Sequence, residues 1–456
     1  MLVKGETVAE ESNASRDTGS VSAADKAATA VAPPLRAVRR QLRNNLNRAP
    51  APRPLVEQFK KGQQVNRKPK KVKVHSLTGR IDDRMMRAAF KSVKRNRGAA
   101  GIDKQSIVMF EANLDQNLLA LVRDLKSGEF YPRPLRRVYI PKADGRQRPL
   151  GIPAVRDRVA QEVLRRLISP VFEPKFHDDS YGFRPRRNCH QAVERVLELH
   201  GAGHIHVLDA DIEGFFDNLP HRVIMAAVAA EIADGNILRL VERFLRSGVI
   251  EDGVRKPTTV GTPQGGVISP LLANIVLNHL DWQLHEHGYL FVRYADDFVV
   301  LCPSAAQAEE AKRLVEQVLA ELGLQLSASK TETTTRKRGY SFLGFAIGSQ
   351  AVTMRRQSVE KFKAKVRELT PRKANLEAGV IGRLNALIRG TANYFATRFS
   401  RCSRQFLILD RWTRMRLRCM KFKRKWMTDN YRLQVKHLKR LGLLTLRDLS
   451  QPAKVN

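Results

Sequence analysis

The sequence predicts an α+β fold whose strands deliver acidic residues to one site. Two short apolar runs typical of β-strands, residues 204–212 and 291–301, contain or end in aspartates. Between and after these runs, apolar residues recur every three or four positions, as they do on one face of a helix. Alternating signals of this kind favour a sheet covered by helices.

The charge of the chain indicates a polyanionic partner. Among 456 residues, 81 are Lys or Arg and 45 are Asp or Glu, which gives a formal net charge of +36. Solubility needs far less, so nucleic acid is the favoured partner and an anionic membrane surface the alternative. No apolar run approaches the roughly 20 residues that span a bilayer, so no membrane partner is expected. The first residues lack a signal-peptide core. A cytoplasmic location, in bacteria the cytoplasm or nucleoid, is therefore expected.

The N-terminal segment, residues 1–75, is predicted to be a disordered, basic arm. Residues 1–33 are small and polar without apolar periodicity, a composition that cannot offset the entropy of ordering. Residues 34–75 hold thirteen Lys and Arg and a single acid, Glu57. This charge run favours a nucleic-acid-binding arm, with a merely solubilising tail as the alternative.

The first strand and the helix that follows it are predicted from residue 204 onward. The strand at 204–212 carries Asp209 and Asp211 near its end. Ser269 and Pro270 start a helix, because proline is favoured in a first helical turn. One apolar face of this helix holds Leu272, Ile275, Val276 and Leu280.

A hairpin and a second helix follow. Residues 291–301 read as two β runs joined at Ala295-Asp296-Asp297, which places carboxylates at the tip of the hairpin. Ser304 and Gln307 have capping-box spacing, so a helix should begin directly after Pro303. Its apolar residues repeat with helical spacing and should face the sheet: Ala311, Leu314, Val315, Val318, Leu319 and Leu322.

The C-terminal part is predicted to be helical and basic, since strand signals vanish after about Gln350. Residues 398–440 hold fifteen Lys and Arg but two acids. One stripe of a predicted helix is apolar and should be core: Trp412, Met415, Cys419, Phe422 and Trp426. A cationic stripe lies beside it: Arg411, Arg414, Arg418, Lys421 and Lys425. We expect Arg411, Arg414 and Arg418 to bind RNA phosphates, with generic solvated surface as the alternative.

The acids of the strand and the hairpin have the chemistry of a metal site. Nucleotidyl transfer uses two divalent ions about 3.5 to 4 Å apart, and carboxylates must converge there. Mg²⁺ prefers oxygen ligands. Asp211, Asp296 and Asp297 could supply them for Mg²⁺, or for Mn²⁺. A paired aspartate alone is usually a solvated turn, so the surrounding motifs decide.

Those motifs resemble the group II intron-encoded reverse transcriptase and maturase family. Tyr294-Ala-Asp-Asp297 is similar to the catalytic motif of reverse transcriptases. The other matching segments occur in the family's order: Ile140-Pro-Lys142, Arg148-Pro-Leu-Gly-Ile-Pro153, Ser180-Tyr-Gly-Phe-Arg-Pro185, Asp209 to Asp217, Gly261-Thr-Pro-Gln-Gly-Gly266, Ser269 to Asn274, Lys330-Thr331 and Ser341-Phe-Leu-Gly-Phe345. The resemblance covers about residues 95 to 345. A looser one, at Asn385, Arg389, Gly390, Asn393, Tyr394 and Phe395, is to the family's maturase domain.

The resemblance implies a right-hand polymerase. Fingers and a ferredoxin-like palm are expected in residues 76–350 and an α-helical thumb or maturase domain in 351–425. Residues 426–456 would then form a short basic region that binds DNA or RNA.

Catalytic roles follow from the same resemblance. Asp211, Asp296 and Asp297 are expected to be catalytic metal ligands, with the backbone of Ile212 reaching the second metal. Spacing alone leaves Asp209 eligible, because it lies two residues earlier on the same strand face.

Nucleotide-binding roles are implied for five residues. Lys142 and Arg148 would grip the triphosphate, and Gln264 would contact the incoming nucleotide, with Gly265 and Gly266 allowing close backbone approach. The ring of Phe216 would exclude a ribose 2′-hydroxyl, or it is ordinary core. Lys330 would protonate leaving pyrophosphate, or it is a surface lysine. A primer grip is implied for Phe342, Leu343 and Gly344, which could equally be core.

The function implied is copying of RNA into DNA, with binding of intron RNA to assist splicing and retrohoming. The expected partners are template and intron RNA, primer and target DNA, and dNTPs; the sequence does not indicate an oligomeric state. Two alternatives remain open. One is a reverse transcriptase recruited to host defence or repair, and the other is an RNA-binding splicing maturase that does not polymerise.

Overall fold

The computed structural model describes residues 73–141, 147–262 and 265–450. Most of the expected basic arm, together with Lys142 and Gln264, lies outside these residues. Within them, no helix is long and apolar enough to cross a membrane. The described residues all belong to one compact unit of the chain.

The fingers combine helices with a four-stranded sheet of order β2-β1-β4-β5, in which β1 and β4 run parallel. Polar side chains begin two of the helices: those of Asp82 and Ser106 accept hydrogen bonds from the backbone of α3 and α4. The elements are η1 (Thr78–Arg80), α3 (Asp83–Asn96), α4 (Ile107–Ala112), α5 (Leu114–Ser127), β1 (Leu135–Pro141), β2 (Gln147–Ile152), α6 (Val155–Phe172), η2 (Glu173–Lys175), β4 (Val249–Glu251) and β5 (Val254–Lys256).

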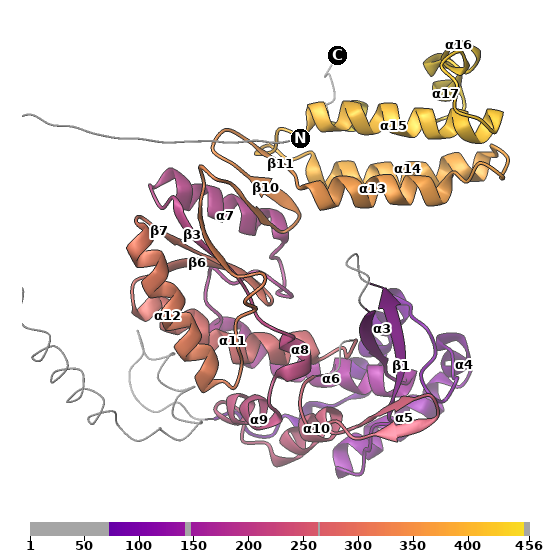
Figure 1. Ribbon diagram of the computed structural model, residues 1–456. Coiled ribbons are helices and arrows are strands. Elements are labelled where there is room, and N and C mark those ends of the chain that lie inside the picture. The colour runs from indigo at the N-terminus through magenta and orange to yellow at the C-terminus, as the bar shows by residue number, and fades with distance from the viewer. Residues whose placement is uncertain (1–72, 142–146, 263–264, 451–456) are drawn as a thin grey trace, which may run out of the picture. The chain divides into compact units, whose positions relative to one another are not determined.

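The palm is an antiparallel sheet of order β6-β7-β3-β8. Figure 1 labels its strands β3, β6 and β7. Helices connect β3 to β6 and β7 to β8, so the topology is the predicted ferredoxin-like one. The elements are α7 (Cys189–Gly201), β3 (His206–Asp211), α8 (Phe215–Asn218), α9 (His221–Ala229), α10 (Gly235–Leu245), α11 (Ser269–Glu286), β6 (Leu290–Tyr294), β7 (Asp297–Cys302), α12 (Ala305–Glu321) and β8 (Glu332–Thr335).

The predicted strands and helices of the palm are confirmed. The side chain of Ser304 accepts from the Gln307 amide at the start of α12, as the capping spacing requires. Ala311, Val315, Val318 and Leu319 are buried against the sheet. One buried face was predicted for α11, but the helix is buried on its other side as well, at Asn274 and Asp281.

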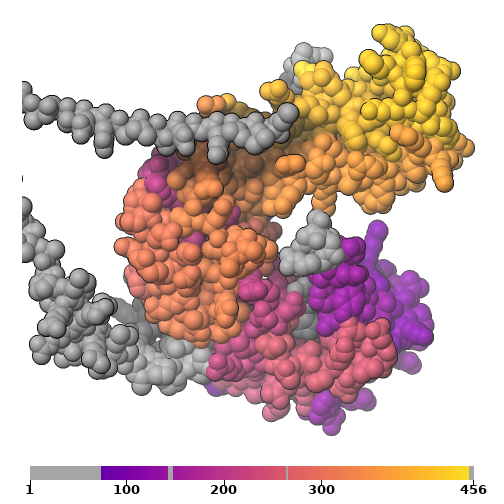
Figure 2. All heavy atoms as spheres, viewed as in Figure 1, coloured from indigo at the N-terminus to yellow at the C-terminus, as the bar shows by residue number. Residues whose placement is uncertain are grey.

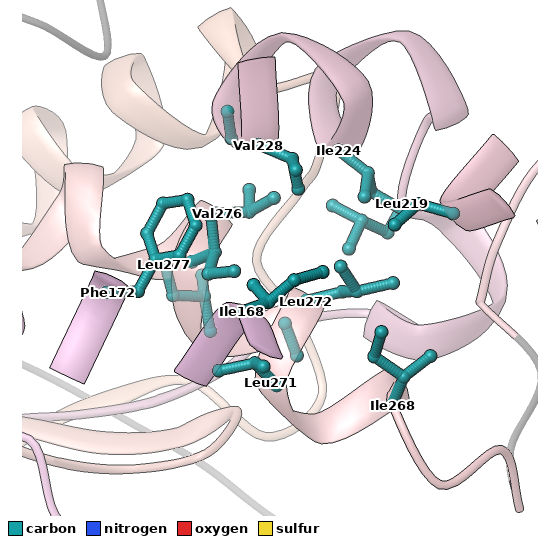
Figure 3. Close-up of a cluster of buried hydrophobic side chains, with 14 of the residues drawn as sticks. Ile168, Phe172, Leu219, Ile224, Val228, Ile268, Leu271, Leu272, Val276 and Leu277 are labelled. Atoms are coloured by element: carbon teal, nitrogen blue, oxygen red, sulfur yellow. The ribbon is translucent and has the colours of Figure 1, made fainter. Parts of the chain in front are cut away.

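The palm sheet separates two hydrophobic cores. Alternate residues of β7 point to opposite faces, as strand geometry requires: Phe298 and Val300 join a core with the fingers and α11, whereas Val299 and Leu301 join a core with α7 and the C-terminal helices. Figure 3 shows part of the first core, where Ile168 and Phe172 of α6 meet Leu272, Val276 and Leu277 of α11. The sheet is therefore covered on both faces.

A second sheet and a helical region complete the described chain. The sheet has order β11-β10-β9, and β11 corrects the prediction that strands end by about Gln350; three residues are too few to give a period. Gln405 of α15 bonds both backbone groups of Met354 in β11, so these parts adjoin, orange and yellow in Figure 2. The elements are β9 (Tyr340–Phe342), β10 (Phe345–Ile347), β11 (Val352–Met354), α13 (Arg356–Leu369), α14 (Ala378–Phe395), α15 (Ser403–Phe422), α16 (Asp429–Arg432), α17 (Val435–Arg440) and α18 (Leu446–Ser450).

The last three helices share a core with the rest of the helical region. Leu433, Leu438, Leu443 and Leu446 are buried together with residues of α13, α14 and α15. Residues 433 to 446, which belong to the expected C-terminal region at 426–456, therefore pack on the expected thumb.

We predict that Leu272→Ala lowers the free energy of unfolding by about 2 to 5 kcal/mol, because the Leu272 side chain is fully buried in the first core. Urea unfolding followed by circular dichroism measures the loss. Leu119→Ala, a matched change at a side chain that is 66% exposed, should cost less than about 0.5 kcal/mol. Equal losses in the two variants would contradict this account of the core.

Candidate active site

Three aspartates converge at one end of the palm sheet. Asp211, the last residue of β3, lies directly opposite Asp297, the first residue of β7. Asp296 precedes Asp297 in the tight turn that joins β6 to β7. All three line one cavity of about 550 Å³. The structure thus brings together the carboxylates that the sequence analysis selected.

The carboxylates repel one another. Burial first, and then the charges of Asp296 and Asp211, together raise the pKa of Asp297 to about 7. Burial is also the main cause of a raised pKa at Asp296. Like charges directly opposite each other on neighbouring strands are destabilising. An arrangement of this kind requires a cation to hold its ionised form.

Lys330 supplies one cation. Its Nζ lies 2.6 Å from Oδ2 of Asp211. The charge of Arg355, followed by that of Lys330, opposes the pKa rise of Asp297. A single ammonium group cannot neutralise three carboxylates. The donor set consists of oxygens, which Mg²⁺ and Mn²⁺ prefer. The chemistry of these donors therefore suits divalent ions, which Asp211, Asp296 and Asp297 would hold. In the described residues the three carboxylates do not yet form a cluster placed to bind one ion together.

Asp209 takes a different position from Asp211. It pairs with Val299 on β7 and Glu332 on β8, and it does not border the cavity. Burial, followed by the charge of Asp297, raises its pKa to about 7. Of the two acids that spacing left eligible, Asp211 is the one at the cavity.

The turn that carries Asp296 is held by a buried arginine. Arg293 is fully buried in β6, and its Nε and Nη2 bond the two carboxylate oxygens of Asp281 at 2.7 and 2.5 Å. Nη1 donates to Asn274 and, at 3.0 Å, to the carbonyl of Ala295 in the turn, and Nη2 also donates to Ser180. All five donors of the guanidinium are thus satisfied.

A glycine lets a second motif approach this turn. A β-carbon on Gly182 would overlap the backbone nitrogen of Ala295. The carbonyl of Gly182 accepts a hydrogen bond of 2.7 Å from Asn274, which also binds Arg293. The backbone φ of Ala295 is +62°, a conformation that residues other than glycine rarely adopt. The Ser180–Pro185 motif and the aspartate turn therefore form one hydrogen-bonded unit.

Arg293 and Phe183 were not predicted from the sequence as site residues. Arg293 is a charge within the apolar run of 291–301, and an unexplained charge in a buried strand was the signal available. Phe183 is exposed, has φ of +58° and borders the cavity. A bulky residue with positive φ is an outlier that sequence does not reveal.

Three of the five residues expected to bind nucleotide border the cavity: Arg148, Phe216 and Lys330. The Phe216 ring is half-buried and packs against Phe215 at 5.2 Å between centroids. Gly265 and Gly266 border the cavity too, and a β-carbon on Gly265 would come within 2.6 Å of the Gly151 carbonyl oxygen. Gly265 therefore lets two backbone segments come close together beside the cavity, and the approach of this backbone to a nucleotide stays a prediction.

Leu343 and Gly344, expected in the primer grip, form the two-residue turn between β9 and β10. Both have positive φ, as a tight hairpin turn requires. Phe342 is fully buried in the core, whereas Leu343 borders the cavity. The Tyr394 hydroxyl of α14 donates to the Leu343 carbonyl at 2.8 Å, which ties the turn to the helical region.

A second cavity of about 680 Å³ adjoins the first. Both are bordered by Asp297 and Leu343. The second continues along α13 and α14, past Arg355 and Tyr394. A path therefore leads from the aspartates along the helical region.

The three arginines expected to bind RNA differ in their surroundings. Arg411 is exposed, whereas Arg414 and Arg418 are half-buried, and Arg418 donates to the Leu433 carbonyl at 2.9 Å.

The predicted apolar stripe is wrong at its end, because α15 stops at Phe422 and Trp426 is exposed. Lys423 adopts φ of +60°, which ends the helix.

The chain matches two family models. The reverse transcriptase (RNA-dependent DNA polymerase) model matches residues 140–347, and the group II intron maturase-specific domain model matches residues 359–442. The first range includes the whole aspartate site, and the second runs from α13 to the end of α17.

The chain is also similar to individual proteins. It is 37% identical to protein YkfC of Escherichia coli, over 54% of this chain and 75% of YkfC. It is 38% identical to the group II intron-encoded protein LtrA of Lactococcus lactis, over 42% of this chain and 32% of LtrA. A solved telomerase structure from Candida albicans, in complex with a fragment of telomeric RNA, aligns over 74% of this chain and 66% of that chain, with 13% identity and a TM-score of 0.41.

We predict that Arg293→Met lowers the free energy of unfolding by about 3 to 5 kcal/mol, because it leaves Asp281 buried without its partner. Replacing both residues, as Arg293→Met with Asp281→Leu, should recover most of that loss. Urea unfolding of the single and double variants gives the coupling energy. Arg246→Met, at an exposed pair with Glu242, is the control and should cost less than about 1 kcal/mol. Additive losses at Arg293 and Asp281 would contradict the network.

Proposed function

The chain belongs to the group II intron reverse transcriptase and maturase family, and we propose that it copies RNA into DNA by nucleotidyl transfer that depends on two divalent metal ions. The observation that carries this proposal is the convergence of Asp211, Asp296 and Asp297 in one cavity. When bound, the metal ions would activate the primer 3′-hydroxyl and stabilise the leaving oxygen.

The residues around the aspartates would bind and orient the incoming nucleotide. Arg148 borders the cavity and carries a guanidinium that suits a triphosphate. We assign the same task to Lys142 and the contact with the nucleotide to Gln264. Lys330 pairs with Asp211 here, and it would release that carboxylate to the metal and protonate pyrophosphate.

The primer would occupy the second cavity. Leu343 and Gly344 border it beside Asp297, so the primer end would lie next to the metal ligands. The helices α13 and α14 form its other wall. Phe342 would contribute by packing alone, since its side chain is buried.

We further propose that the chain binds intron RNA and assists splicing and retrohoming. Support comes from the maturase-domain match at 359–442 and from the similarity to a group II intron-encoded protein. Arg411 is the exposed member of the expected RNA-binding set. The chain spans about a third of LtrA. A role in host defence or repair is the second candidate, and a group II ribozyme flanking the gene would decide for splicing.

We expect Asp296→Ala to abolish cDNA synthesis while the protein stays folded, because the variant loses a metal ligand and transition-state stabilisation worth several kcal/mol. Extension of a DNA primer on an RNA template in Mg²⁺ measures activity, and circular dichroism confirms folding. Asp115→Ala removes an exposed carboxylate of α5 and should extend normally. Full extension by Asp296→Ala would overturn the proposed function.

We expect Phe216→Ala to admit ribonucleotides, because removal of the ring opens space for a 2′-hydroxyl. The ratio of dNTP to rNTP incorporation should fall by about tenfold or more, as one lost steric contact in a pocket allows. Phe216→Tyr keeps the ring and should keep the discrimination. If the ratio is unchanged in Phe216→Ala, the residue is only packing and another group selects the sugar.

A further inference from the structure

Residues 423–432, which we call the tip loop, expose three large apolar side chains. They follow the end of α15, where α16 projects from the helical region (Figure 1). Trp426 is 65% exposed, Met427 83% and Tyr431 78%. Large apolar side chains that gather at the surface commonly mark a binding site.

Hydrogen bonds and ion pairs hold the backbone of the tip loop, so the exposed side chains have a defined position on the surface. Amides of residues 429, 430 and 431 donate to carbonyls three residues earlier, at 3.0 to 3.3 Å. Asp429 is 1% exposed and pairs with Arg424 at 3.3 Å and Arg432 at 3.8 Å. The Lys423 ammonium donates to the Ala374 carbonyl at 2.5 Å, which anchors the other end of the loop.

The charge around these rings is strongly positive. Residues 421–440 hold eight Lys and Arg and one acid, Asp429, which is buried beneath two arginines. The side chains of Arg424 and Arg432 are more than half exposed. The Arg432 guanidinium also lies 4.8 Å from the Phe422 ring centroid. The surface of this segment therefore offers cations and aromatic faces without an exposed acid.

This combination favours nucleic acid over a protein partner. Protein interfaces are likewise enriched in aromatic residues, Met and Arg, but they are depleted of Lys. Five of the eight cations in residues 421–440 are lysines, and this is what favours nucleic acid. Bases stack on aromatic rings with little sequence preference, while cations follow the phosphates. Unstacked bases are available chiefly in the loops and bulges of folded RNA.

We infer that the tip loop binds unpaired nucleotides of RNA, with Trp426 and Tyr431 stacking on bases and Lys425 contacting phosphate. The inference rests on the proposed binding of intron RNA and names the kind of element recognised. It assigns the exposed rings a task separate from the aspartate cavity.

Tryptophan fluorescence of the full chain tests the stacking directly. Trp426 is exposed, whereas Trp282 and Trp412 are half-buried, so a base that stacks on Trp426 should quench the emission. Unstructured single-stranded RNA of about 12 nucleotides is expected to quench it, and a fully paired RNA duplex of equal charge is not. Trp426→Phe should remove this quenching. Equal quenching by duplex and single-stranded RNA would overturn the inference. Quenching by single-stranded DNA or by anionic phosphatidylserine vesicles, with none by single-stranded RNA, would overturn it too.

Affinity and its salt dependence separate stacking from charge. Trp426→Ala and Tyr431→Ala should each weaken binding of the single-stranded RNA by about fivefold or more. The log–log slope with salt should stay the same, because no phosphate contact is lost. Trp426→Phe and Tyr431→Phe keep a ring and should largely retain the affinity. Lys425→Gln should instead lower the slope by about 0.7.

Two outcomes contradict the inference. The first is unchanged RNA affinity in Trp426→Ala with Tyr431→Ala. The second is a change in oligomeric state in that double variant, which would mean that the rings cover a second copy. Primer extension by the wild-type chain is measured in parallel. If it fails, the proposed polymerase function falls. If it succeeds without quenching by single-stranded RNA, only the tip-loop inference falls.

Discussion

The buried pairing of Arg293 with Asp281 is the interaction on which the aspartate site depends. An unpaired charge in this core would be costly, so the guanidinium needs every partner that it has. Those partners come from α11, from the Ser180–Pro185 motif and from the turn before Asp296. Satisfying one side chain thus fixes three segments that are distant in the sequence. The repulsion among the carboxylates acts against this frame, and bound cations would relieve it.

Close backbone contacts supply the second constraint. Gly182 lies against Ala295, and Gly265 lies against Gly151, so two loops reach the cavity at distances that any side chain would prevent. The fingers strand β2 contains Gly151, whereas Ala295 belongs to the palm. The glycines therefore set where fingers and palm meet the cavity, and the hydrogen bonds of Asn274 hold one of these contacts.

Periodic patterns predicted the parts of the fold whose burial is regular. The palm strands, α11 and α12 followed from such patterns, and the family resemblance supplied the topology and the three aspartates. The errors lie where tertiary contacts override local pattern. Trp426 continues the period of α15, but Lys423 ends the helix first. Arg418 reads as part of a free cationic face, yet a carbonyl of the folded-back chain takes its hydrogen bond. Such partners are distant in sequence and leave no local signal.

The core shared by the palm sheet and the C-terminal helices has a consequence for copying. Val299 and Leu301 of β7 are buried in the same cluster as residues of α13, α14 and α15, and Tyr394 is hydrogen-bonded to the Leu343 turn. A helical domain joined to the catalytic sheet in this way cannot swing aside without exposing apolar surface to water. The helical region should therefore keep its place beside the aspartate cavity during copying, and it should move with the palm sheet as one body.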